Sequence, residues 1–427
     1  MQITFVSNYI NHHQIPFCEA VIKRLSAGDG FTFIQTSEME DDRKSMGWDR
    51  ALPDYVRLSY TDHEENEACR ELILESDVVI FGGCEDESYI SPRLEMLRNL
   101  KGRAPEGDKE PGGRLKNRKL TFRYSERVYK EGQWKFITPR GLRRKYLDHT
   151  RYNDCPVYLL CSGGYVASDF SLFKAYKNKM FKWGYFPKIN EYDPEKFMEK
   201  KGFVPENGND RGNERLPFIL WSGRMLNWKH PELAVETAEY LKEKGLDFRM
   251  RIIGEGPERE RINDMVAKKG LSDKILVEDF KSPGEIRALM EQADIYLFTS
   301  DRREGWGAVA NESLGSCCAL VAGSMIGAVP YLLKNGINSM VYEDGAEKEL
   351  FEKTEMLLRN PELRKKLALK GYETVRKLWN ADTAAERFLE SVAAFREGRE
   401  LPRYEDGPFC REVPKPEKRI SKTAAGK

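Results

Sequence analysis

The sequence lacks the features that mark membrane-spanning, disulfide-bonded, metal-binding and dinucleotide-binding proteins. No apolar run approaches the roughly 20 residues that a membrane-spanning helix needs. The 8 cysteines include no CxxC pair and no Cys/His metal spacing, so we interpret them as reduced thiols of a cytoplasmic protein. The 5 histidines are scattered and suggest no metal site. No GxGxxG follows a strand pattern, which argues against a dinucleotide-dependent dehydrogenase.

An excess of one charge is also missing. The formal net charge of the 427 residues is +1 and 33% of them are charged, so we expect a soluble globular protein with no nucleic-acid partner. The N-terminus begins a strand pattern without the charged and apolar segments of a secretory signal, so we expect no signal peptide.

One segment departs from this balance. Between Arg114 and Lys182, 17 Lys and Arg stand against 5 Asp and Glu, with aromatic residues among the charges. Such a stretch can rest on an anionic membrane surface. It fits equally an ordinary basic surface whose aromatic residues lie in the core, and the sequence leaves both interpretations open.

Short β-rich apolar runs alternate with helical patterns, most regularly in the second half. This alternation predicts an α/β fold with doubly wound parallel sheets. The expected strands are residues 3–7, 31–34, 77–81 and 157–161 in the first half, and 218–223, 248–254, 275–277, 293–300 and 319–322 in the second.

The composition places the domain boundaries. We expect one Rossmann-like domain over residues 1–187, a polar Pro-, Gly- and Asn-bearing linker over 188–215 and a second Rossmann-like domain over 216–378. A helical segment covers 379–400, and the Pro-, Lys- and Glu-rich tail 401–427 is expected to be flexible. The Gly-, Pro- and charge-rich composition of residues 101–117, which shows no periodicity, predicts a mobile surface loop.

The most informative stretch follows the expected strand 293–300. There Glu304 and Glu312 bracket Gly305 and Gly307, which start a helix pattern. Ligands bind at the carboxyl ends of strands in open parallel sheets, and free N–H groups at a helix start hold phosphate. Two acids around a phosphate cradle suit a nucleotide sugar, although the spacing alone would also fit two solvated glutamates.

Two further strand ends of the second half are expected to meet this motif. Gly223 precedes Arg224, and Lys229 follows on the same loop, while Gly254 and Glu255 leave the next strand. Arg and Lys can both donate to a diphosphate, or they can be ordinary surface cations. Because no Asp-x-Asp motif stands nearby, we predict a metal-independent site without a cofactor.

These motifs resemble the retaining glycosyltransferases of family 4, and the resemblance covers most of the chain. It is strongest in the second half, and in the first half it points to bacterial members that build surface polysaccharides. The residues that carry it are 222–224 with Lys229, 254–257 and 304–312, together with 121–127 and 182–187.

The resemblance implies the roles of the donor-site residues. Arg224 and Lys229 would hold the donor diphosphate and stabilise the leaving group, and Glu304 would contact the donor sugar. The backbone amides near Gly305 and Trp306 would help to hold the phosphates or the sugar.

The resemblance also implies the architecture. Two facing Rossmann-like domains would form the GT-B fold, with the last helix crossing back onto the first domain.

By the same resemblance, Glu312 would bond the ribose hydroxyls of the donor.

One departure from the family concerns the acceptor side. Many members carry a His after a strand like 77–81, where this sequence reads Gly-Gly-Cys-Glu, so we assign no catalytic base. The acceptor-side candidates are His13, Gly83, Glu126 and Arg127. The alternatives are a solvated or capping His, a simple glycine turn and a surface ion pair.

Together these features predict a cytoplasmic hexosyltransferase that acts with retention on a nucleotide-diphosphate sugar. The acceptor would be a saccharide or a lipid-linked saccharide at the inner membrane face. A nucleotide-sugar 2-epimerase of the same fold remains an alternative, which would need no acceptor. So does a non-catalytic nucleotide-sugar-binding protein, which would bind donor without turnover.

Overall fold

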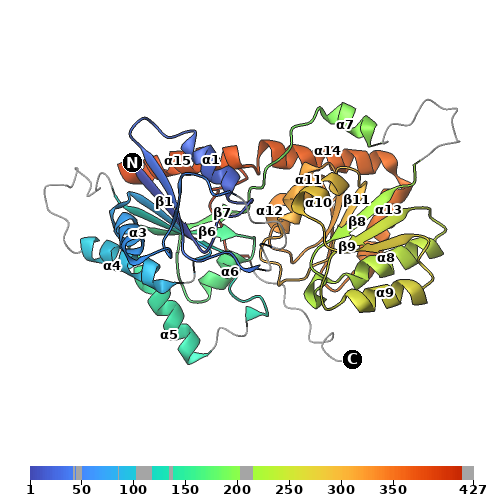
Figure 1. Cartoon of the computed structure of the whole chain (residues 1–427), viewed down its shortest axis with the longest axis horizontal. Coiled ribbons are helices and arrows are strands. Elements are labelled where there is room, and N and C mark those ends of the chain that lie inside the picture. The colour runs from blue at the N-terminus through green and yellow to red at the C-terminus, as the bar shows by residue number, and fades with distance from the viewer. Residues whose placement is uncertain are drawn as a thin grey trace.

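The chain forms two α/β domains, each built on a parallel sheet, as the computed structural model shows (Figure 1). The structure describes residues 1–41, 44, 51–84, 86–101, 118–133, 138–201 and 215–415. Within these residues no helix is both long and apolar enough to cross a membrane. Residues 102–117 of the expected loop and residues 416–427 of the expected tail lie outside this description.

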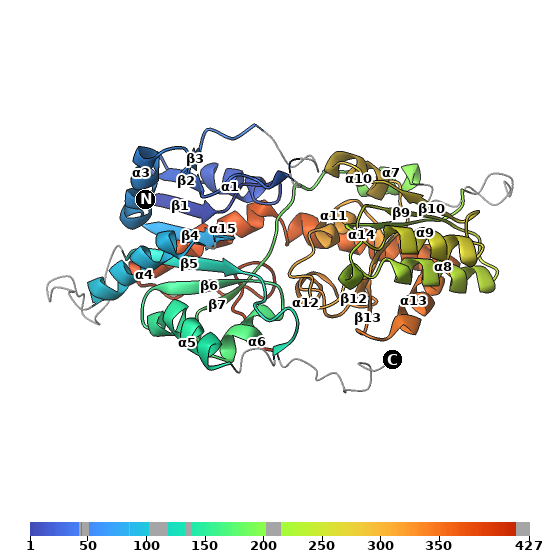
Figure 2. The same cartoon turned by 60° about the horizontal axis from the view of Figure 1, so that its bottom comes forward.

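The first sheet has seven parallel strands among the described residues, in the order β3-β2-β1-β4-β5-β6-β7. Its central strands are apolar on both faces because helices cover the sheet from both sides (Figure 2). The strands are β1 (Gln2–Ser7), β2 (Gly30–Gln35), β3 (Val56–Leu58), β4 (Val78–Gly82), β5 (Leu120–Ser125), β6 (Val157–Ser162) and β7 (Met180–Trp183).

The second sheet has six described parallel strands in the order β10-β9-β8-β11-β12-β13. Both sheets therefore reverse their strand order once, between β1 and β4 in the first and between β8 and β11 in the second. The strands are β8 (Phe218–Ser222), β9 (Arg249–Ile253), β10 (Ile275–Glu278), β11 (Ile295–Phe298), β12 (Ala319–Gly323) and β13 (Met340–Tyr342).

Helices follow most of the strands. Those of the first half are α1 (Ile15–Ile22), α3 (His63–Glu75), α4 (Glu87–Lys101), α5 (Pro139–Asp148), η4 (Thr150–Tyr152), α6 (Val166–Ser171) and α7 (Pro194–Lys200). Those of the second half are η5 (Asn227–Lys229), α8 (Glu232–Glu243), α9 (Arg259–Lys268), α10 (Pro283–Met290), α11 (Val309–Gly315), α12 (Val329–Leu332), α13 (Glu347–Arg359), α14 (Pro361–Lys377) and α15 (Ala381–Glu397).

The last helix crosses from the second domain to the first, as the resemblance implied. Helix α14 lies along the second sheet, and the chain restarts as α15 along the first (Figures 1 and 2). Asn380 marks the restart, because its side chain accepts a hydrogen bond from the backbone N–H of Thr383 at 2.8 Å. Phe388 of α15 is fully buried, and its ring lies 5.8 Å from that of Phe17 and 5.2 Å from that of Phe122.

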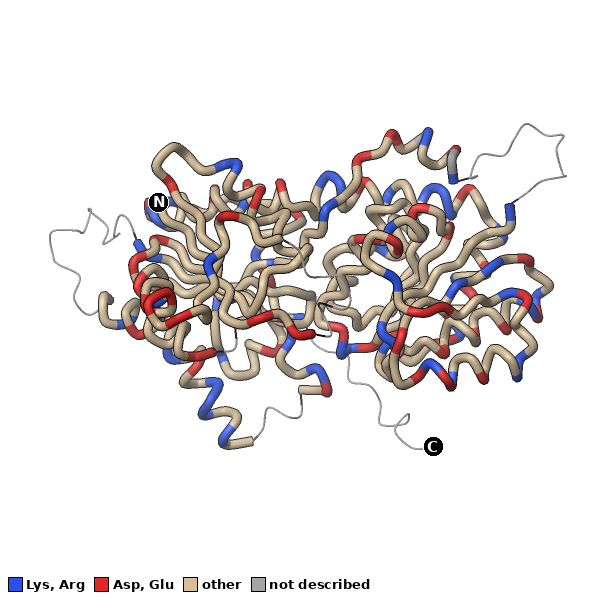
Figure 3. Tube along the Cα trace, in the orientation of Figure 1, with Lys and Arg blue, Asp and Glu red and all other residues tan. Residues whose placement is uncertain are grey.

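Helix α5 projects from the first domain and carries a run of basic residues (Figures 1 and 3). None of its residues is buried. Leu142 and Tyr146 are 37% and 55% exposed, one turn apart on the same side of the helix. The helix therefore contributes little to the core.

The start of the tail corrects the expectation of a flexible segment. The backbone N–H of Lys182 in β7 donates to Cys410 at 2.8 Å, and the N–H of Phe409 donates back to Lys182 at 2.8 Å. Phe409 is buried against Phe181, with the ring centroids 4.7 Å apart. The polar composition of 401–427 hid several buried residues, among them Phe409 and Cys410, that cover the open edge of β7, whose backbone groups need partners.

The expected linker also contains structure. Residues 194–200 form α7, and Lys201 directly after it is buried. The Lys201 ammonium donates to the carbonyls of Ala293 at 2.9 Å, Ser316 at 2.6 Å and Cys317 at 2.9 Å, which ties this segment to the second domain. Strands β3, β5, β7 and β13 were not among the expected strands. Three of them, β3, β7 and β13, have only three or four residues, and runs this short leave little pattern.

The crossing helix gives a stability prediction. Replacing Phe388 with Ala removes a fully buried ring between α15 and the first sheet, so the free energy of unfolding should fall by about 3–5 kcal/mol. Chemical denaturation followed by tryptophan fluorescence measures this change. The control Leu276→Ala, at a side chain that is 55% exposed on β10, should change it by no more than about 0.5 kcal/mol. Equal effects of the two replacements would contradict the packing described for α15.

The turn from η5 into α8 places a histidine between two acids. His230 adopts a left-handed backbone conformation with φ of 49°. Its Nδ1 lies 2.9 Å from Glu232 and its Nε2 lies 3.5 Å from Asp301. Hydrogen bonding to Asp301, and then to Glu232, raises the pKa of His230 from 6.5 to about 9.

This shift predicts how stability depends on pH. The folded protein holds the His230 proton to higher pH than the unfolded chain, so the stabilisation is complete below about 6.5 and is lost as the pH rises through 9. Unfolding free energies measured by urea titration should fall over this range in the wild type and fall less in His230→Asn. Asn is chosen because it tolerates the left-handed conformation. The same pH dependence in both proteins would contradict the assignment.

Candidate functional site

A cavity of about 930 Å³ lies between the two domains. Its walls come from the loops after β8, β9 and β11 of the second domain, and from residues of the first domain such as His13, Glu126 and Tyr185. The second sheet reverses its strand order between β8 and β11. Open α/β sheets bind ligands at this position, at the carboxyl ends of their strands.

Nearly all the donor-site residues predicted from the sequence meet in this cavity. They come from three separate strand ends, which the parallel sheet brings to one edge. Those lining the cavity are Gly223, Arg224, Lys229, Gly254, Glu255, Glu304, Gly305, Gly307 and Glu312.

An ion pair links two of these strand ends. The ammonium of Lys229, after β8, donates to Oε2 of Glu304, after β11, at 2.6 Å. Ser300 donates to the same carboxylate oxygen at 3.0 Å. The side chains of Lys229 and Glu304 are only 16% and 14% exposed, so solvent screens this pair less than a surface pair.

A second set of bonds holds the backbone of Lys229 in place. The hydroxyl of Thr299 donates to the Lys229 carbonyl at 2.7 Å, and the indole N–H of Trp221 donates to that hydroxyl at 2.8 Å. The Lys229 ammonium also lies 4.7 Å from the ring centre of Trp228. The position of this cation is therefore set before any ligand binds.

Arg224 supplies a second cation at the cavity. Its side chain is exposed, and among the described residues none forms an ion pair or hydrogen bond with its guanidinium. Glu255, the acid on the neighbouring loop, pairs with Arg259 at 3.1 Å instead. Arg224 is therefore able to donate its planar fork to an anionic ligand.

The glycines of the site allow the loops to approach one another closely. Gly254 has φ of 148°, and a Cβ there would fall 1.9 Å from the carbonyl oxygen of Gly223. Gly307 has φ of 86°, and a Cβ there would fall 2.4 Å from the ring of Phe298. At Gly305 a Cβ would fall 1.9 Å from a carboxylate oxygen of Glu126 in the first domain. Side chains at these positions would separate the parts of the site.

Glu312 faces the same cavity from α11. Burial raises the pKa of its carboxyl, and the positive charge of Arg287 opposes that rise. One ligand atom from each of His12, His13 and Glu312 lies within 4.8 Å of the other two. The spacing of the histidines in the sequence did not reveal this cluster, because its third member comes from the other domain. A metal-independent site remains a prediction.

The side chain of Trp306 packs between the two domains and is not part of the cavity lining. Its side chain is fully buried and points away from the cavity, with its indole N–H donating to Asn311 at 2.9 Å. The ring packs over Gly184, where a Cβ would fall 2.3 Å from it. The side chain of Trp306 therefore stabilises the contact between the domains, and only its backbone remains near the site.

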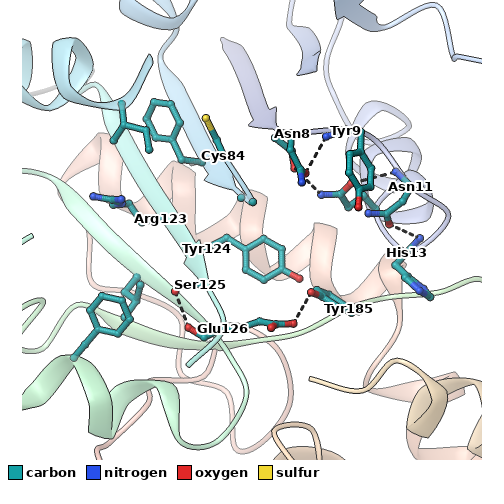
Figure 4. A pocket seen from close by; sticks show the side chains of 18 of the residues that line it. Asn8, Tyr9, Asn11, His13, Cys84, Arg123, Tyr124, Ser125, Glu126 and Tyr185 are labelled. Carbon is teal, nitrogen blue, oxygen red and sulfur yellow. Dashed lines mark hydrogen bonds between the residues drawn. The ribbon is translucent and has the colours of Figure 1, made fainter. Parts of the chain in front are cut away.

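A smaller cavity of about 460 Å³ adjoins the first at the carboxyl ends of β1, β4 and β5 (Figure 4). It contains three of the four acceptor-side candidates, namely His13, Glu126 and Gly83, which directly follows β4. Because this sheet reverses its order between β1 and β4, the smaller cavity occupies the equivalent position in the first domain.

Arg127, the fourth acceptor-side candidate, was a wrong prediction. Its side chain is 1% exposed and lies against the buried Asp169 of α6, with Nη2 at 3.3 Å from the carboxylate. The ring of Tyr165 lies 5.5 Å from the guanidinium carbon. Arg127 follows Glu126 directly but turns into the domain, because the buried carboxylate of Asp169 requires a cation nearby.

Sequence reasoning missed several residues that shape the site. Tyr185 lines both cavities and donates to Glu126 at 2.7 Å, and Lys130 donates to the other oxygen of that carboxylate at 2.8 Å. Ser300 bonds Glu304. Ser300 ends the expected strand 293–300, and Tyr185 lies in the family motif 182–187. Neither position carries a sequence signal that assigns a role to the side chain.

Comparison with known proteins identifies the second domain. Residues 206–374 match the family model described as "Glycosyl transferases group 1". An alpha-D-kanosaminyltransferase of Streptomyces kanamyceticus is 29% identical over 157 residues, which are 37% of this chain and 40% of that protein. A putative colanic acid biosynthesis glycosyltransferase, WcaL of Escherichia coli, is 33% identical over 82 residues, 19% of this chain and 20% of its own. The chain thus matches less than half the length of these relatives.

Solved structures resemble the whole two-domain fold. HepE of Anabaena in complex with UDP has a TM-score of 0.64 at 11% identity, covering 92% of this chain and 100% of that chain. WaaG, a glycosyltransferase involved in lipopolysaccharide biosynthesis, has a TM-score of 0.55 at 15% identity, covering 90% and 99%. These likenesses confirm the expected GT-B fold. Residues 206–374 are a domain of the glycosyl transferases group 1 family, within a chain of two facing parallel-sheet domains.

Proposed function

We propose that the protein is a retaining glycosyltransferase of polysaccharide or glycolipid biosynthesis, which moves a hexose from a nucleoside diphosphate to a hydroxyl of a saccharide. One observation carries the proposal. Two cations, Lys229 and the exposed Arg224, line one cavity at the point where the second sheet reverses its strand order, and Lys229 forms an ion pair with Glu304 there. The structural neighbour HepE was solved with UDP and with UDP-glucose, which supports a nucleotide-sugar donor.

Each residue of the site binds a different part of the donor. Lys229 and Arg224 bind the diphosphate and stabilise the negative charge that grows on it as its bond to the sugar breaks. Glu304 contacts the sugar, and its orientation is fixed by Ser300 and Lys229. Glu312 bonds the ribose. Two cations supply the charge that a metal would otherwise provide, so the transfer should survive chelation by EDTA.

The domains act together in this proposal. The donor lies on the second domain and the acceptor enters from the first, so bond formation occurs in the crevice between them. Side chains of both domains line the cavity, which limits the access of water and with it hydrolysis of the donor.

The donor site is tested by binding and by activity. One of the UDP-, GDP-, ADP- and dTDP-sugars should raise the melting temperature of the wild type. Lys229→Ala and Glu304→Ala should each lower transfer by roughly 100-fold or more, because each removes a charge placed at the reacting centre. The control Lys366→Ala changes an exposed lysine of α14 and should leave the rate unaltered.

The outcomes separate the alternatives. Rates like those of the wild type in both variants would refute the site. Product formed from donor alone would point to an epimerase, and donor binding without turnover on any acceptor would point to a non-catalytic binder.

We also propose peripheral contact with an anionic membrane through α5. Arg140, Arg143 and Arg144 of this helix are exposed. The exposed Leu142 and Tyr146 add apolar groups suited to the headgroup region. Each basic residue near such a surface contributes about 1 kcal/mol of attraction. This contact would bring the first domain to a lipid-linked acceptor.

Vesicle sedimentation tests this contact. The wild type should sediment with vesicles that contain phosphatidylglycerol and not with pure phosphatidylcholine. Replacing the three arginines by Gln should weaken binding by about tenfold or more. The matched control replaces Lys366, Lys370 and Lys377 of α14 by Gln and should bind as the wild type does. Equal binding by both triple variants would refute a role for α5.

A further inference from the structure

We infer that the smaller cavity binds the acceptor as a neutral saccharide unit, and that Glu126 accepts a hydrogen bond from one of its hydroxyls where the two cavities meet. The inference rests on the proposed function and goes beyond it by naming the class of acceptor and the residue that selects it. Figure 4 shows the cavity and the side chains that converge on it.

The walls of the smaller cavity suit a neutral, hydroxyl-rich ligand. Its volume of about 460 Å³ lies within the range of roughly 300–1,000 Å³ that is usual for small-molecule sites. The side-chain amides of Asn8 and Asn11 line it from the loop after β1. Their carbonyl oxygens accept backbone hydrogen bonds at 2.9 and 3.0 Å, and within the described residues their amide N–H groups donate to no protein atom. Those donors are available to sugar hydroxyls.

The charges of the cavity favour a neutral ligand over an anionic one. Among its described lining residues, the formal charges belong to Arg123 and Glu126, besides two histidines. Arg123 is already engaged, since its side chain is 13% exposed and donates to the carbonyl of Asp148 at 2.7 Å. Burial lowers the pKa of His149 well below its usual value, so this ring is neutral. An acidic sugar would meet the Glu126 carboxylate, which repels it.

Glu126 lies at the junction of the two cavities. Together with His13 and Tyr185 it lines both. One carboxylate oxygen accepts from Tyr185 at 2.7 Å and the other from Lys130 at 2.8 Å, so the group is held in a single orientation. It also touches the backbone of Gly305, the residue after Glu304. An acceptor that reaches from the smaller cavity to the donor sugar must pass this carboxylate.

The carboxylate keeps capacity for one more partner. Its two oxygens offer about four lone pairs, and two of these are used by Tyr185 and Lys130. A hydroxyl of the acceptor can therefore donate to Glu126 without displacing either bond. A hydrogen bond to a charged group would contribute about 10- to 100-fold to acceptor binding. Because water needs no such alignment, donor hydrolysis does not depend on it.

The experiment uses the full chain, the donor that stabilises it most and a panel of simple acceptors. The panel contains the methyl glycosides of glucose, galactose, mannose and N-acetylglucosamine, with methyl glucuronide as the anionic member. The wild type should glycosylate at least one neutral glycoside and prefer it to the glucuronide. Glu126→Ala should lower acceptor-dependent turnover by about 10- to 100-fold and should lower donor hydrolysis much less.

A conservative variant separates charge from shape. Glu126→Gln keeps an oxygen for Tyr185 and removes the negative charge, so its preference for neutral over anionic glycosides should shrink. Asn11→Asp keeps the oxygen that bonds His13 and removes the amide donor, so the acceptor KM should rise while the donor KM does not. The controls Glu71→Gln and Asn263→Asp lie on exposed faces of α3 and α9 and should behave as the wild type.

Failure of the inference differs from failure of the proposed function. If donor binds but no neutral glycoside is glycosylated, or if Glu126→Ala lowers hydrolysis and transfer together, the inference is overturned. If no nucleotide sugar binds at all, the proposed function itself fails.

Discussion

The ion pair between Lys229 and Glu304 links the loops that follow β8 and β11, the two strands between which the second sheet reverses its order. It sets the distance between the loops after β8 and β11, and thereby the shape of the larger cavity. An ammonium has three donors, of which Glu304 takes one, so the same cation can bind an anionic ligand without losing its position. The surrounding bonds from Thr299, Trp221 and Ser300 restrict both partners of the pair.

The two domains place their cavities in the same way. Each sheet reverses its strand order once, and each reversal opens a cavity at the carboxyl ends of its strands. The cavities join because the domains meet closely, with Gly305 against Glu126 and the backbone N–H of Gly164 donating to Gly327 at 2.9 Å. On the proposed function, a donor on one side and an acceptor on the other would meet at this contact. The crossing helix α15 and the buried Trp306 stabilise the arrangement.

The donor side of the site was largely visible in the sequence, for a physical reason. In a parallel sheet every strand ends at the same edge, so a glycine or a charged residue just after a predicted strand is placed without knowing any side-chain contact. Arg224, Lys229 and Glu304 were found in this way, and Glu312 was found from the helix pattern that follows the last of them. The two sheets and the crossing helix followed from the alternation and the resemblance.

The features that the sequence did not reveal concern the direction of side chains and long-range contacts. Glu126 and Arg127 are neighbours after the same strand, yet one side chain faces the crevice and the other turns to Asp169, 42 positions away. Trp306 lies inside the central motif but fills a space that Gly184 leaves in the other domain. The tail looked flexible because its composition is polar, whereas buried residues such as Phe409 and Cys410 cover the edge of β7. Local patterns carry no information about such partners.

The most direct test of the account is a crystal structure of the protein with the nucleoside diphosphate that stabilises it most. The account predicts that the diphosphate lies in the larger cavity within hydrogen-bonding distance of Lys229 and Arg224, with the Lys229–Glu304 pair intact. A diphosphate bound elsewhere on the protein, or one that contacts neither cation, would contradict it.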